Sequence, residues 1–489
     1  MELTRLINSI DSIQVTGNVQ RKDILSIAID SRKVSKNSVF IAIEGLKTDG
    51  HRFILDAINQ GAYAVISEKD TIPSEIYNHA NCVRILVKDS RIALAQISKA
   101  FYNNAADKMQ LIGVTGTNGK TTTTYFIKNI LDEAGYKSGL IGTISNLIAQ
   151  DVREAYLTTP DAHELHALFH EMHSFGCQYA IMEVSSHSLS MKRVHGLNFA
   201  AGIFTNITSD HLDFHKDFTN YLGSKKILFD SLSESSFCIV NADDKHTDFL
   251  LNDTKAKIFK YGKKESADFL ITDIKVDLNG TEFLCIINNN SFKISTKLIG
   301  EFNAYNAAGA FAFGYCLGLK PEDIIESIKN TPQVPGRFEV VKGKTKYAVV
   351  DYSHTSDSLE KAILNLRKVA PQSNLITVFG CGGDRDNSKR PIMGKIASEL
   401  SDFTIVTNDN PRSEEAMYII SQITDGISKS NYEVVPDRGE AIRRAIINSP
   451  ENSVILIAGK GHEDYQIIGK IKTHFSDKET AQKYLAEIK

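Results

Sequence analysis

The stretch from Leu111 to Thr122 constrains the fold of this chain more than any other. An apolar run enters a glycine-broken turn there, and a helix-compatible segment from Thr123 to Ala134 follows it. This order predicts a strand, a tight loop and a helix that begins near Lys120. Glycines allow backbone N–H groups to turn towards an anion, and the helix N-terminus adds partial positive charge. The stretch therefore predicts a phosphate-binding loop for ATP or GTP.

The predicted loop departs from the common G-x-x-x-x-G-K-[ST] spacing at one position. Val114 stands where that pattern has its first glycine, with Gly113 and Gly116 on either side. Lys120 can still reach the outer phosphates, and the hydroxyl of Thr121 can hold Mg²⁺. An ordinary glycine-rich turn before a helix is the alternative interpretation, and the order of strand, loop and helix favours the nucleotide site.

The composition excludes several classes of protein. The chain has 489 residues, enough for about three domains. Its net charge of −3 gives no electrostatic case for binding nucleic acid or a membrane surface. The 6 cysteines are scattered without a C-x-x-C pair, which is typical of reduced cytosolic thiols. No apolar run approaches the roughly 20 residues that span a bilayer, and no signal-peptide core is present. We expect a cytoplasmic protein.

Short apolar runs alternate with helical patterns along the chain, which predicts an α/β protein. In the first hundred residues the expected strands are 24–29, 39–43, 62–67 and 84–87, with helices at 53–60 and 91–101. The central part adds strands at 137–141, 179–184 and 200–205, a helix at 162–175, and a β-rich patch at 267–298 with a hairpin-turn signal at Asn279-Gly280. Breaks at Pro332 and Pro335 precede strands at 347–351, 375–379, 403–407 and 454–458. We therefore place domains at 1–102, 103–333 and 334–489.

Polar side chains gather just beyond the predicted strands, where open parallel sheets bind ligands. Glu183 follows one strand and is a candidate Mg²⁺ ligand beside Thr121, because Mg²⁺ prefers oxygen. A carboxylate that caps the next helix is the alternative. His211, between Asp210 and Asp213, follows the next strand, and a structural histidine is the alternative there.

Four polar or glycine-rich loops follow the strands of the last third and indicate a binding rim. They span residues 352–355, 380–386, 408–412 and 459–464. No G-x-G-x-x-G lies between a strand and a helix in this part of the sequence. Its absence disfavours a dinucleotide-dependent oxidoreductase.

Taken in order, these motifs resemble those of the Mur ligases, the ATP-dependent amide-bond-forming enzymes of peptidoglycan synthesis. The shared segments are 113–122, 158–160, 183–187, 205–207, 210–213, 351–355, 409–412 and 459–464. The resemblance runs the full length of the chain. It implies a small N-terminal α/β UDP-binding domain, a central P-loop ATPase-type parallel sheet and a C-terminal Rossmann-like domain. It also implies a role in cell wall biogenesis, and through it in cell shape and division.

The resemblance implies ATP and Mg²⁺ as cofactors. It gives catalytic roles to Lys120, Glu183, His211 and Lys225. The implied Mg²⁺ ligands are Thr121, Glu183, His211 and a carbamate on Lys225, with Lys226 as the competing position for the carbamate. Carbamylation turns a cation into an oxygen-bearing anion, and it requires a neutral amine. The other implied ATP contacts are Gly116, Thr117, Asn118, Gly119, Lys120, Thr121, Thr122, Asn303, Arg337 and Asp351.

The resemblance also implies two further substrates, UDP-N-acetylmuramoyl-L-alanyl-D-glutamate and meso-diaminopimelate, joined through an acyl phosphate by a monomeric enzyme. The implied UDP-sugar contacts are Ser31, Thr158, Thr159, Ser185 and Arg193. Met191 stands where related enzymes often have glutamine. A surface turn is the alternative for Ser31. The implied diaminopimelate contacts are Arg385, Asp409, Asn410, Arg412, Gly459 and Glu463.

Arg412 decides the amino-acid substrate in this interpretation. Diaminopimelate differs from L-lysine by one carboxylate, which the planar fork of Arg412 can bind bidentately and Arg385 can also contact. A lysine-adding ligase is the first alternative, and relatives of that kind usually lack this arginine. A folylpolyglutamate synthetase is the second, although it would not be expected to carry the Asp-Asn-Pro-Arg loop. A nucleotide switch that binds partners without forming a bond is the third.

Overall fold

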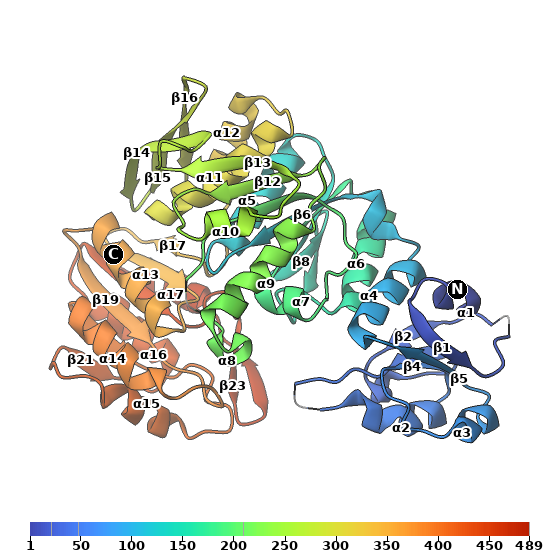
Figure 1. Ribbon diagram of the computed structural model, residues 1–489. Helices are drawn as coiled ribbons and strands as arrows, with labels where there is room; N and C mark the ends of the chain where they lie inside the picture. Colours follow the sequence, from blue (N-terminus) through green and yellow to red (C-terminus); the bar gives the residue numbers. More distant parts are fainter. Residues whose placement is uncertain (21, 47, 209, 489) are drawn as a thin grey trace. The chain divides into compact units, whose positions relative to one another are not determined.

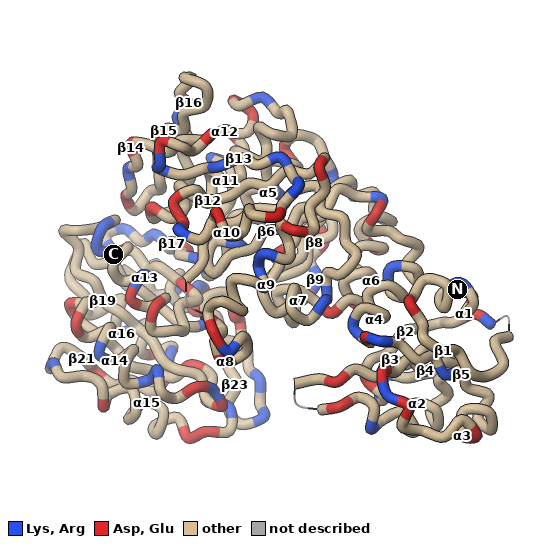
Figure 2. The backbone as a smooth tube through the Cα atoms, viewed as in Figure 1, with Lys and Arg blue, Asp and Glu red and all other residues tan. Residues whose placement is uncertain are grey.

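The computed structural model describes residues 1–489 apart from residues 21, 47, 209 and 489. The chain forms two compact units, Met1–Lys260 and Tyr261–Lys489. Figure 1 colours them from blue to green and from green to red. Among the described residues, no helix is long and apolar enough to cross a bilayer. Figure 2 shows Lys and Arg interspersed with Asp and Glu along both units, in keeping with the small net charge.

The first unit begins with a five-stranded sheet. Its order is β1 (Ser12–Thr16), β5 (Val83–Val87), β4 (Ala62–Ser67), β3 (Ser38–Ile41), β2 (Ser26–Ala28), and only β1 runs antiparallel to its neighbour. Separate apolar clusters cover its two faces, because successive residues of a strand such as Val39 and Phe40 point to opposite sides. The helical segments are α1 (Leu3–Ile7), η1 (Ser31–Lys33), η2 (Gly50–Phe53), α2 (Ile54–Asn59), α3 (Ser74–His79), α4 (Ser90–Phe101) and η3 (Ala105–Lys108).

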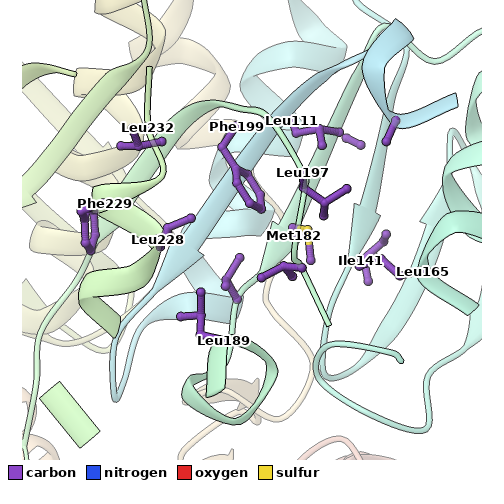
Figure 3. Close-up of a cluster of buried hydrophobic side chains, with 14 of the residues drawn as sticks. Leu111, Ile141, Leu165, Met182, Leu189, Leu197, Phe199, Leu228, Phe229 and Leu232 are labelled. Atoms are coloured by element: carbon purple, nitrogen blue, oxygen red, sulfur yellow. The ribbon is translucent and has the colours of Figure 1, made fainter. Parts of the chain in front are cut away.

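A second sheet completes this unit. Its order is β12 (Phe237–Asn241), β11 (Phe199–Phe204), β6 (Gln110–Thr115), β10 (Tyr179–Glu183), β7 (Ser138–Ile141), β8 (Ser145–Ile148), β9 (Asp151–Glu154). The strands from β12 to β7 are parallel, and β8 and β9 follow as antiparallel strands. The helices are α5 (Lys120–Glu133), α6 (Ala162–Ser174), α7 (Ser186–Ser190), α8 (Leu212–His215), α9 (Phe218–Asp230) and α10 (Thr247–Leu251). Strands β6, β10 and β11 are buried almost throughout, and part of their core is drawn in Figure 3.

The register of this sheet places the polar strand ends together. Glu183 of β10 pairs with Val114 of β6, and Phe204 of β11 pairs with Thr115. The segments that leave β6, β10, β11 and β7 therefore start at one edge of the sheet. That edge carries the phosphate loop.

Besides the two-stranded sheet of a hairpin, the second unit contains two larger groups of strands. In the first, β14 (Phe269–Asp277), β15 (Gly280–Ile287) and β16 (Asn290–Thr296) are antiparallel neighbours, and Tyr261 of β13 (Lys257–Gly262) pairs with β14. The other has the order β17 (Glu339–Lys342), β18 (Tyr347–Asp351), β22 (Ser453–Ala458), β19 (Asn374–Phe379), β20 (Phe403–Val406), β21 (Tyr432–Val434), parallel from β18 onward. The remaining elements are α11 (Glu301–Cys316), α12 (Pro321–Asn330), α13 (Ser356–Val369), α14 (Lys389–Leu400), α15 (Ala416–Thr424), α16 (Arg438–Asn448), α17 (Asp477–Glu487) and the hairpin β23 (Tyr465–Ile468) and β24 (Ile471–His474).

The six-stranded sheet has the binding rim that the sequence predicts. Asp351 pairs with Ala458, Ala458 with Phe379, and Phe379 with Val406. The four polar loops that follow these residues consequently meet at one sheet edge. The predicted three-domain boundaries stay predictions, although the five-stranded sheet lies within residues 1–102 and the six-stranded sheet within 334–489.

Candidate active site

The phosphate loop joins β6 to α5, as the sequence predicts. Gly116 has φ +154, and a Cβ there would lie 1.9 Å from the hydroxyl of Thr205. Gly119, with φ +89, occupies the left-handed region just before the first residue of α5. The loop is fixed from outside: Thr117 N donates to Asn206 O (2.8 Å), and Thr205 Oγ1 donates to Asn118 O (2.6 Å). A preformed anion cradle results at the N-terminus of a 14-residue helix.

Two lysines meet at one carbonyl oxygen of this loop. The Nζ atoms of Lys120 and Lys225 each donate to Gly116 O at 2.9 Å. Lys225 is buried, and its Nζ lies 4.7 Å from the centroid of the Tyr221 ring. Burial, followed by the charge of Lys120, holds the pKa of Lys225 well below its usual range. This environment favours the neutral amine that carbamylation requires.

The adjacent lysine has different surroundings. Lys226 Nζ lies 2.5 Å from Asp230 Oδ1 and 2.5 Å from Asp253 Oδ2, and these hydrogen bonds help to raise its pKa against the opposing effect of burial. The ammonium group of Lys226 is thus paired with two carboxylates on the outer side of α9. Of the two positions left open by the sequence, Lys225 is the one that faces the phosphate loop.

Glu183 lies beside Thr121, as expected from the sequence. Thr121 Oγ1 donates to Glu183 Oε1 at 3.0 Å, and both side chains are buried. Thr143 supplies a second pair of bonds: its N–H donates to Oε1 (2.8 Å) and its hydroxyl to Oε2 (3.0 Å). Thr143 follows β7 at the same sheet edge. It fixes both carboxylate oxygens of Glu183, a role that the sequence reasoning missed.

His211 lies among other aromatic rings near the loop. It has φ +54, and its ring centroid is 4.8 Å from that of His187. Burial, and then the charges of Lys120 and Lys225, lower its pKa, although Asp210 opposes the shift. The Nε2 atom lies 3.5 Å from Asp210 Oδ2.

Thr121 and Glu183 fit a Mg²⁺ ion, because a hydroxyl and a carboxylate oxygen converge at the edge of an anion cradle. A second metal ion beside His211 would need additional ligands from Lys225. Within the described part of the chain, no three His, Cys, Asp or Glu residues cluster closely enough to hold a metal. A carbamate on Lys225 would add the oxygen ligands that a second ion needs there.

The predicted UDP-sugar contacts lie at and behind a cavity of about 840 Å³ in the first unit. Ser31, at the start of η1, and Arg193 both line this cavity. Arg193 is held in place because Nη1 donates to Thr159 O (2.9 Å) and Nε lies 2.7 Å from Asp161 Oδ1. Arg32, beside Ser31 in η1, also lines the cavity and pairs with Asp30. Arg91 and Lys192 add further cationic groups to the lining, and the sequence reasoning missed both. Met191 is part of the wall.

A hydrogen-bonded chain connects this cavity with the phosphate loop. Thr159 Oγ1 donates to Glu183 O (2.8 Å) and accepts from Ser185 N (3.1 Å). The Thr158 hydroxyl lies 3.0 Å from the hydroxyl of Thr143. The structure thus brings Thr158, Thr159 and Ser185 together between Arg193 and Glu183.

The second unit carries the remaining predicted nucleotide contacts. Asn303 is buried in α11, where Nδ2 donates to Ile299 O (2.9 Å) and Oδ1 accepts from Asn306 (2.9 Å). Asp351 accepts from Phe338 N (2.9 Å) and from the Ser353 hydroxyl, and burial raises its pKa. Both side chains therefore already hold bonds within their unit. Their roles towards ATP stay predictions.

Arg337 stacks with the next loop. Its guanidinium lies 5.0 Å from the centroid of the Tyr352 ring, and Tyr352 in turn lies 5.1 Å from the ring of His462. Among the described residues, its buried Nε atom has no hydrogen-bond partner. A donor left in that state suits a phosphate or another anion.

Two of the predicted amino-acid contacts, Asn410 and Glu463, form one network with the buried Lys460. Asn410 Nδ2 donates to Glu463 Oε2 at 2.9 Å. Lys460 Nζ lies 3.2 Å from Asn410 Oδ1 and 3.3 Å from Glu463 Oε2. Gly459 approaches Asp409 so closely that a Cβ would lie 2.8 Å from its Oδ2. Lys460 already places one ammonium group against this pair, and the two carboxylates of Asp409 and Glu463 leave an excess of negative charge that suits a ligand's ammonium group.

The two predicted arginines meet at Gly382. A Cβ at that position would lie 3.0 Å from Arg412 Nη1 and 3.8 Å from Arg385 Cγ. Arg412 Nη1 also donates to Gly383 O at 2.8 Å. The rim therefore has the Arg412 guanidinium and the aliphatic stem of Arg385 at one place, and the Asn410–Glu463 pair at another.

Three protein-family models match consecutive parts of the chain: the Mur ligase family catalytic domain at residues 23–102, the Mur ligase middle domain at 114–314 and the Mur ligase glutamate ligase domain at 336–461. The chain is 42% identical over 493 residues to a UDP-N-acetylmuramoyl-L-alanyl-D-glutamate–2,6-diaminopimelate ligase of Clostridium botulinum, with 100% of both chains covered. A relative of the same name from Cytophaga hutchinsonii is 41% identical over 482 residues, with 98% of each chain covered.

Solved structures agree with these matches. A structure described as UDP-N-acetylmuramoyl-L-alanyl-D-glutamate–2,6-diaminopimelate ligase superposes with a TM-score of 0.71 and 29% identity, with 99% of both chains covered. The MurF ligase of Thermotoga maritima in complex with ADP shares the fold, with a TM-score of 0.62 and 18% identity over 94% of this chain and 96% of that one.

The fold and the site define an ATP-dependent amide ligase. The chain belongs to the Mur ligase family.

Proposed function

We propose that this ligase joins meso-diaminopimelate to the D-glutamyl carboxylate of UDP-N-acetylmuramoyl-L-alanyl-D-glutamate, in peptidoglycan precursor synthesis. The observation that carries the proposal is the pair of arginines at Gly382 beside the Asn410–Glu463 network. Diaminopimelate has an ammonium and a carboxylate at each end, and L-lysine lacks the second carboxylate. An arginine fork matches that extra group. The full-length relatives named as ligases of this substrate pair support the same proposal.

The residues of the first unit suit the activation step. The γ-phosphoryl group passes from ATP to a carboxylate oxygen, so that one P–O bond breaks, another forms, and ADP leaves. Lys120 and the loop amides stabilise the transferring charge. Mg²⁺ held by Thr121 and Glu183, and a second ion at His211 and carbamylated Lys225, would neutralise the phosphate oxygens when bound.

Amide formation completes the reaction. The neutral amine attacks the acyl carbon, the C–N bond forms, the C–O bond to phosphate breaks, and inorganic phosphate leaves. In the second unit, Asn410 and Glu463 hold an ammonium end of the amino acid, and Arg385 and Arg412 hold the carboxylate that distinguishes it from lysine.

Coupled assays test this proposal. ADP release is measured with and without the UDP-dipeptide, and with meso-diaminopimelate or L-lysine as the amine, and the product is weighed by mass spectrometry. We expect ADP release that requires all three substrates and a kcat/KM for diaminopimelate at least about 100-fold above that for lysine, the scale of two charged contacts.

Other outcomes identify the rivals. A preference for lysine would make the chain a lysine-adding ligase. ADP release that ignores the UDP-dipeptide would favour a nucleotide switch, and a requirement for a folate substrate would favour a folylpolyglutamate synthetase.

A further inference from the structure

The two loops that carry Arg385 and Arg412 are joined to each other by their backbones. Here they are termed the first arginine loop (380–386) and the second arginine loop (408–414). Gly383 N donates to Asn410 O at 2.9 Å, and a Cβ on Gly383 would lie 2.0 Å from Pro411 O. No side chain fits between the loops at this point. A displacement of one loop therefore displaces the other.

A buried arginine, Arg390, forms hydrogen bonds with both arginine loops. The side chain of Arg390, in α14, is 0% exposed. It makes a bidentate contact with Glu414 of the second arginine loop, with Nη1 2.8 Å from Oε2 and Nη2 2.9 Å from Oε1. Its Nη2 also donates to Gly382 O of the first arginine loop at 3.2 Å, and Nη1 donates to Gln422 at 2.6 Å. One guanidinium thus contacts both loops.

Glu414 completes the connection. Its Oε1 accepts a hydrogen bond from Asp384 N at 2.6 Å, in the first arginine loop. The hydrogen bonds from Arg390 and Asp384 lower the pKa of Glu414 to about 2, so that the carboxylate stays charged at neutral pH. A return contact runs from Ser413 Oγ to Asp384 Oδ1 at 2.5 Å.

The arginines depend on these ties because the backbone next to them is strained. Arg412 has φ +53 and Asp384 has φ +55, in the left-handed region that is unfavourable for a residue with a side chain. Loop contacts must hold such a conformation in place. Gly382, which Arg390 contacts through its carbonyl, is also the residue beside which the side chains of Arg385 and Arg412 meet.

We propose that Arg390 and Glu414 are positioning residues that set the preference of this ligase for an amino acid with a second, distal carboxylate. The proposal rests on the proposed function and deepens it. A carboxylate fork works only if both guanidinium groups keep their place and direction. L-Lysine has no carboxylate for the two arginines to bind, so its kcat/KM should not depend on the contacts of Arg390 and Glu414.

The test compares two amino acids in the full-length enzyme. Glu414→Gln removes the charge and keeps the shape, and Arg390→Lys keeps the charge and removes the fork. For each variant, kcat and KM are measured for meso-diaminopimelate and L-lysine, together with KM for ATP. We expect the ratio of kcat/KM for diaminopimelate to that for lysine to fall by about tenfold or more, through a higher KM for diaminopimelate.

A matched control is available in the same unit. Arg367 forms an arginine–carboxylate pair with Asp402 (2.8 Å) and donates to Leu400 O, away from both arginine loops. Arg367→Lys should leave the ratio within about twofold of wild type, since a surface pair contributes little. Glu414→Asp retains the charge and retracts it by one methylene, which gives a milder variant if Arg390→Lys does not fold.

The outcomes separate the two proposals. Wild-type enzyme without a preference for diaminopimelate overturns the proposed function before any variant is measured. If wild type shows the preference and the folded variants lose kcat/KM equally for both amino acids, the pair only supports the fold and the inference is wrong. A selective rise in KM for diaminopimelate, with KM for ATP unchanged, supports it.

Discussion

At the scale of single residues, Lys225 and Lys226 are neighbours in opposite environments. Lys225 is buried beside a second lysine at Gly116 O, whereas Lys226 has two carboxylate partners near the surface. Burial and the charge of Lys120 both disfavour a second ammonium group at this carbonyl. Conversion of Lys225 to an anionic carbamate would remove that second positive charge and supply oxygens for a metal.

The two lysines should therefore differ sharply on replacement. Lys225→Ala is expected to lower kcat by about 100-fold or more, since a metal ligand and its supporting charge are lost. Lys226→Ala should retain activity within about twofold, because it removes only exposed ion pairs. ADP release in buffers with and without bicarbonate measures both effects, and only Lys225→Ala should be insensitive to bicarbonate. The reverse pattern would assign the carbamate to Lys226.

At the scale of single residues, the sequence predicted the side chains that lie within contiguous motifs. Lys120, Thr121 and Glu183 lie together at the sheet edge, as strand-end reasoning expects. Thr143 could have been found in the same way, since it follows β7 in the same sheet. Arg390 could not, because its partner Glu414 is 24 positions away and nothing local indicates the pairing.

At the scale of elements, Arg438 and Asp477 join two helices to the strand ends of the six-stranded sheet. Both side chains are 0% exposed, and Arg438 Nε lies 2.7 Å from Asp477 Oδ1. Arg438 also donates to Asn408 O (3.1 Å) and Ala458 O (3.0 Å), just before two loops of the binding rim. The pair therefore connects α16 and α17 with the end of β22 and the start of the second arginine loop.

Removal of one partner should be far more damaging than removal of both. Asp477→Asn leaves a buried guanidinium without its counter-charge, at an expected cost of about 3–5 kcal/mol in the free energy of unfolding. The double variant Arg438→Met with Asp477→Leu should cost less than the single variant, since no charge remains buried. Urea unfolding of the full chain, followed by circular dichroism, measures both. Equal losses in the two variants would contradict this prediction.

Element-scale prediction worked best where a strand is fully buried. Runs such as 111–114 and 454–458 are apolar without interruption because helices cover both faces of their sheets. Among the described residues, nine strands were missed, and one of them, β12, is buried over most of its length; they are β1, β8, β9, β12, β13, β17, β21, β23 and β24. Strand β9 and the hairpin strand β24 are largely exposed, so their sequences carry no continuous apolar run.

At the scale of the molecule, buried histidines should make the first unit sensitive to acid. His166 of α6 is buried, and neither ring nitrogen has a hydrogen-bond partner among the described residues. Burial, and then the charge of Lys99, lower its pKa from 6.5 to about 4. Below pH 6.5 the unfolded chain binds a proton that the folded chain does not, so stability is lost as the pH falls from about 6.5 to 4.

This loss should reach about 3 kcal/mol from His166 alone, from a shift of about two and a half pH units. His166→Leu should flatten the fall in stability over that window, whereas His170→Leu, at an exposed position of the same helix, should not. Thermal or urea unfolding at pH 7, 6, 5 and 4 gives the comparison. An unchanged slope in His166→Leu would show that other groups control acid unfolding.

The sequence predicted the α/β class of the fold, but it did not predict many of the contacts between distant segments. Alternating strands and helices give the α/β class, and ordered motifs give the family. The shared sheet edges follow from parallel strands with short polar loops. Side-chain partners from distant segments, such as those of Arg390 and Arg438, arise only when the sheets are assembled.

The backbone contact between Gly383 and Asn410 has a consequence for engineering. A chimera whose first arginine loop had a residue other than glycine at position 383 would bring a Cβ to 2.0 Å from Pro411 O of the second arginine loop. The two arginine loops, Arg390 and Glu414 form one transferable module. We expect that a change of amino-acid preference requires the exchange of that whole module, and that a single exchanged arginine achieves only part of it.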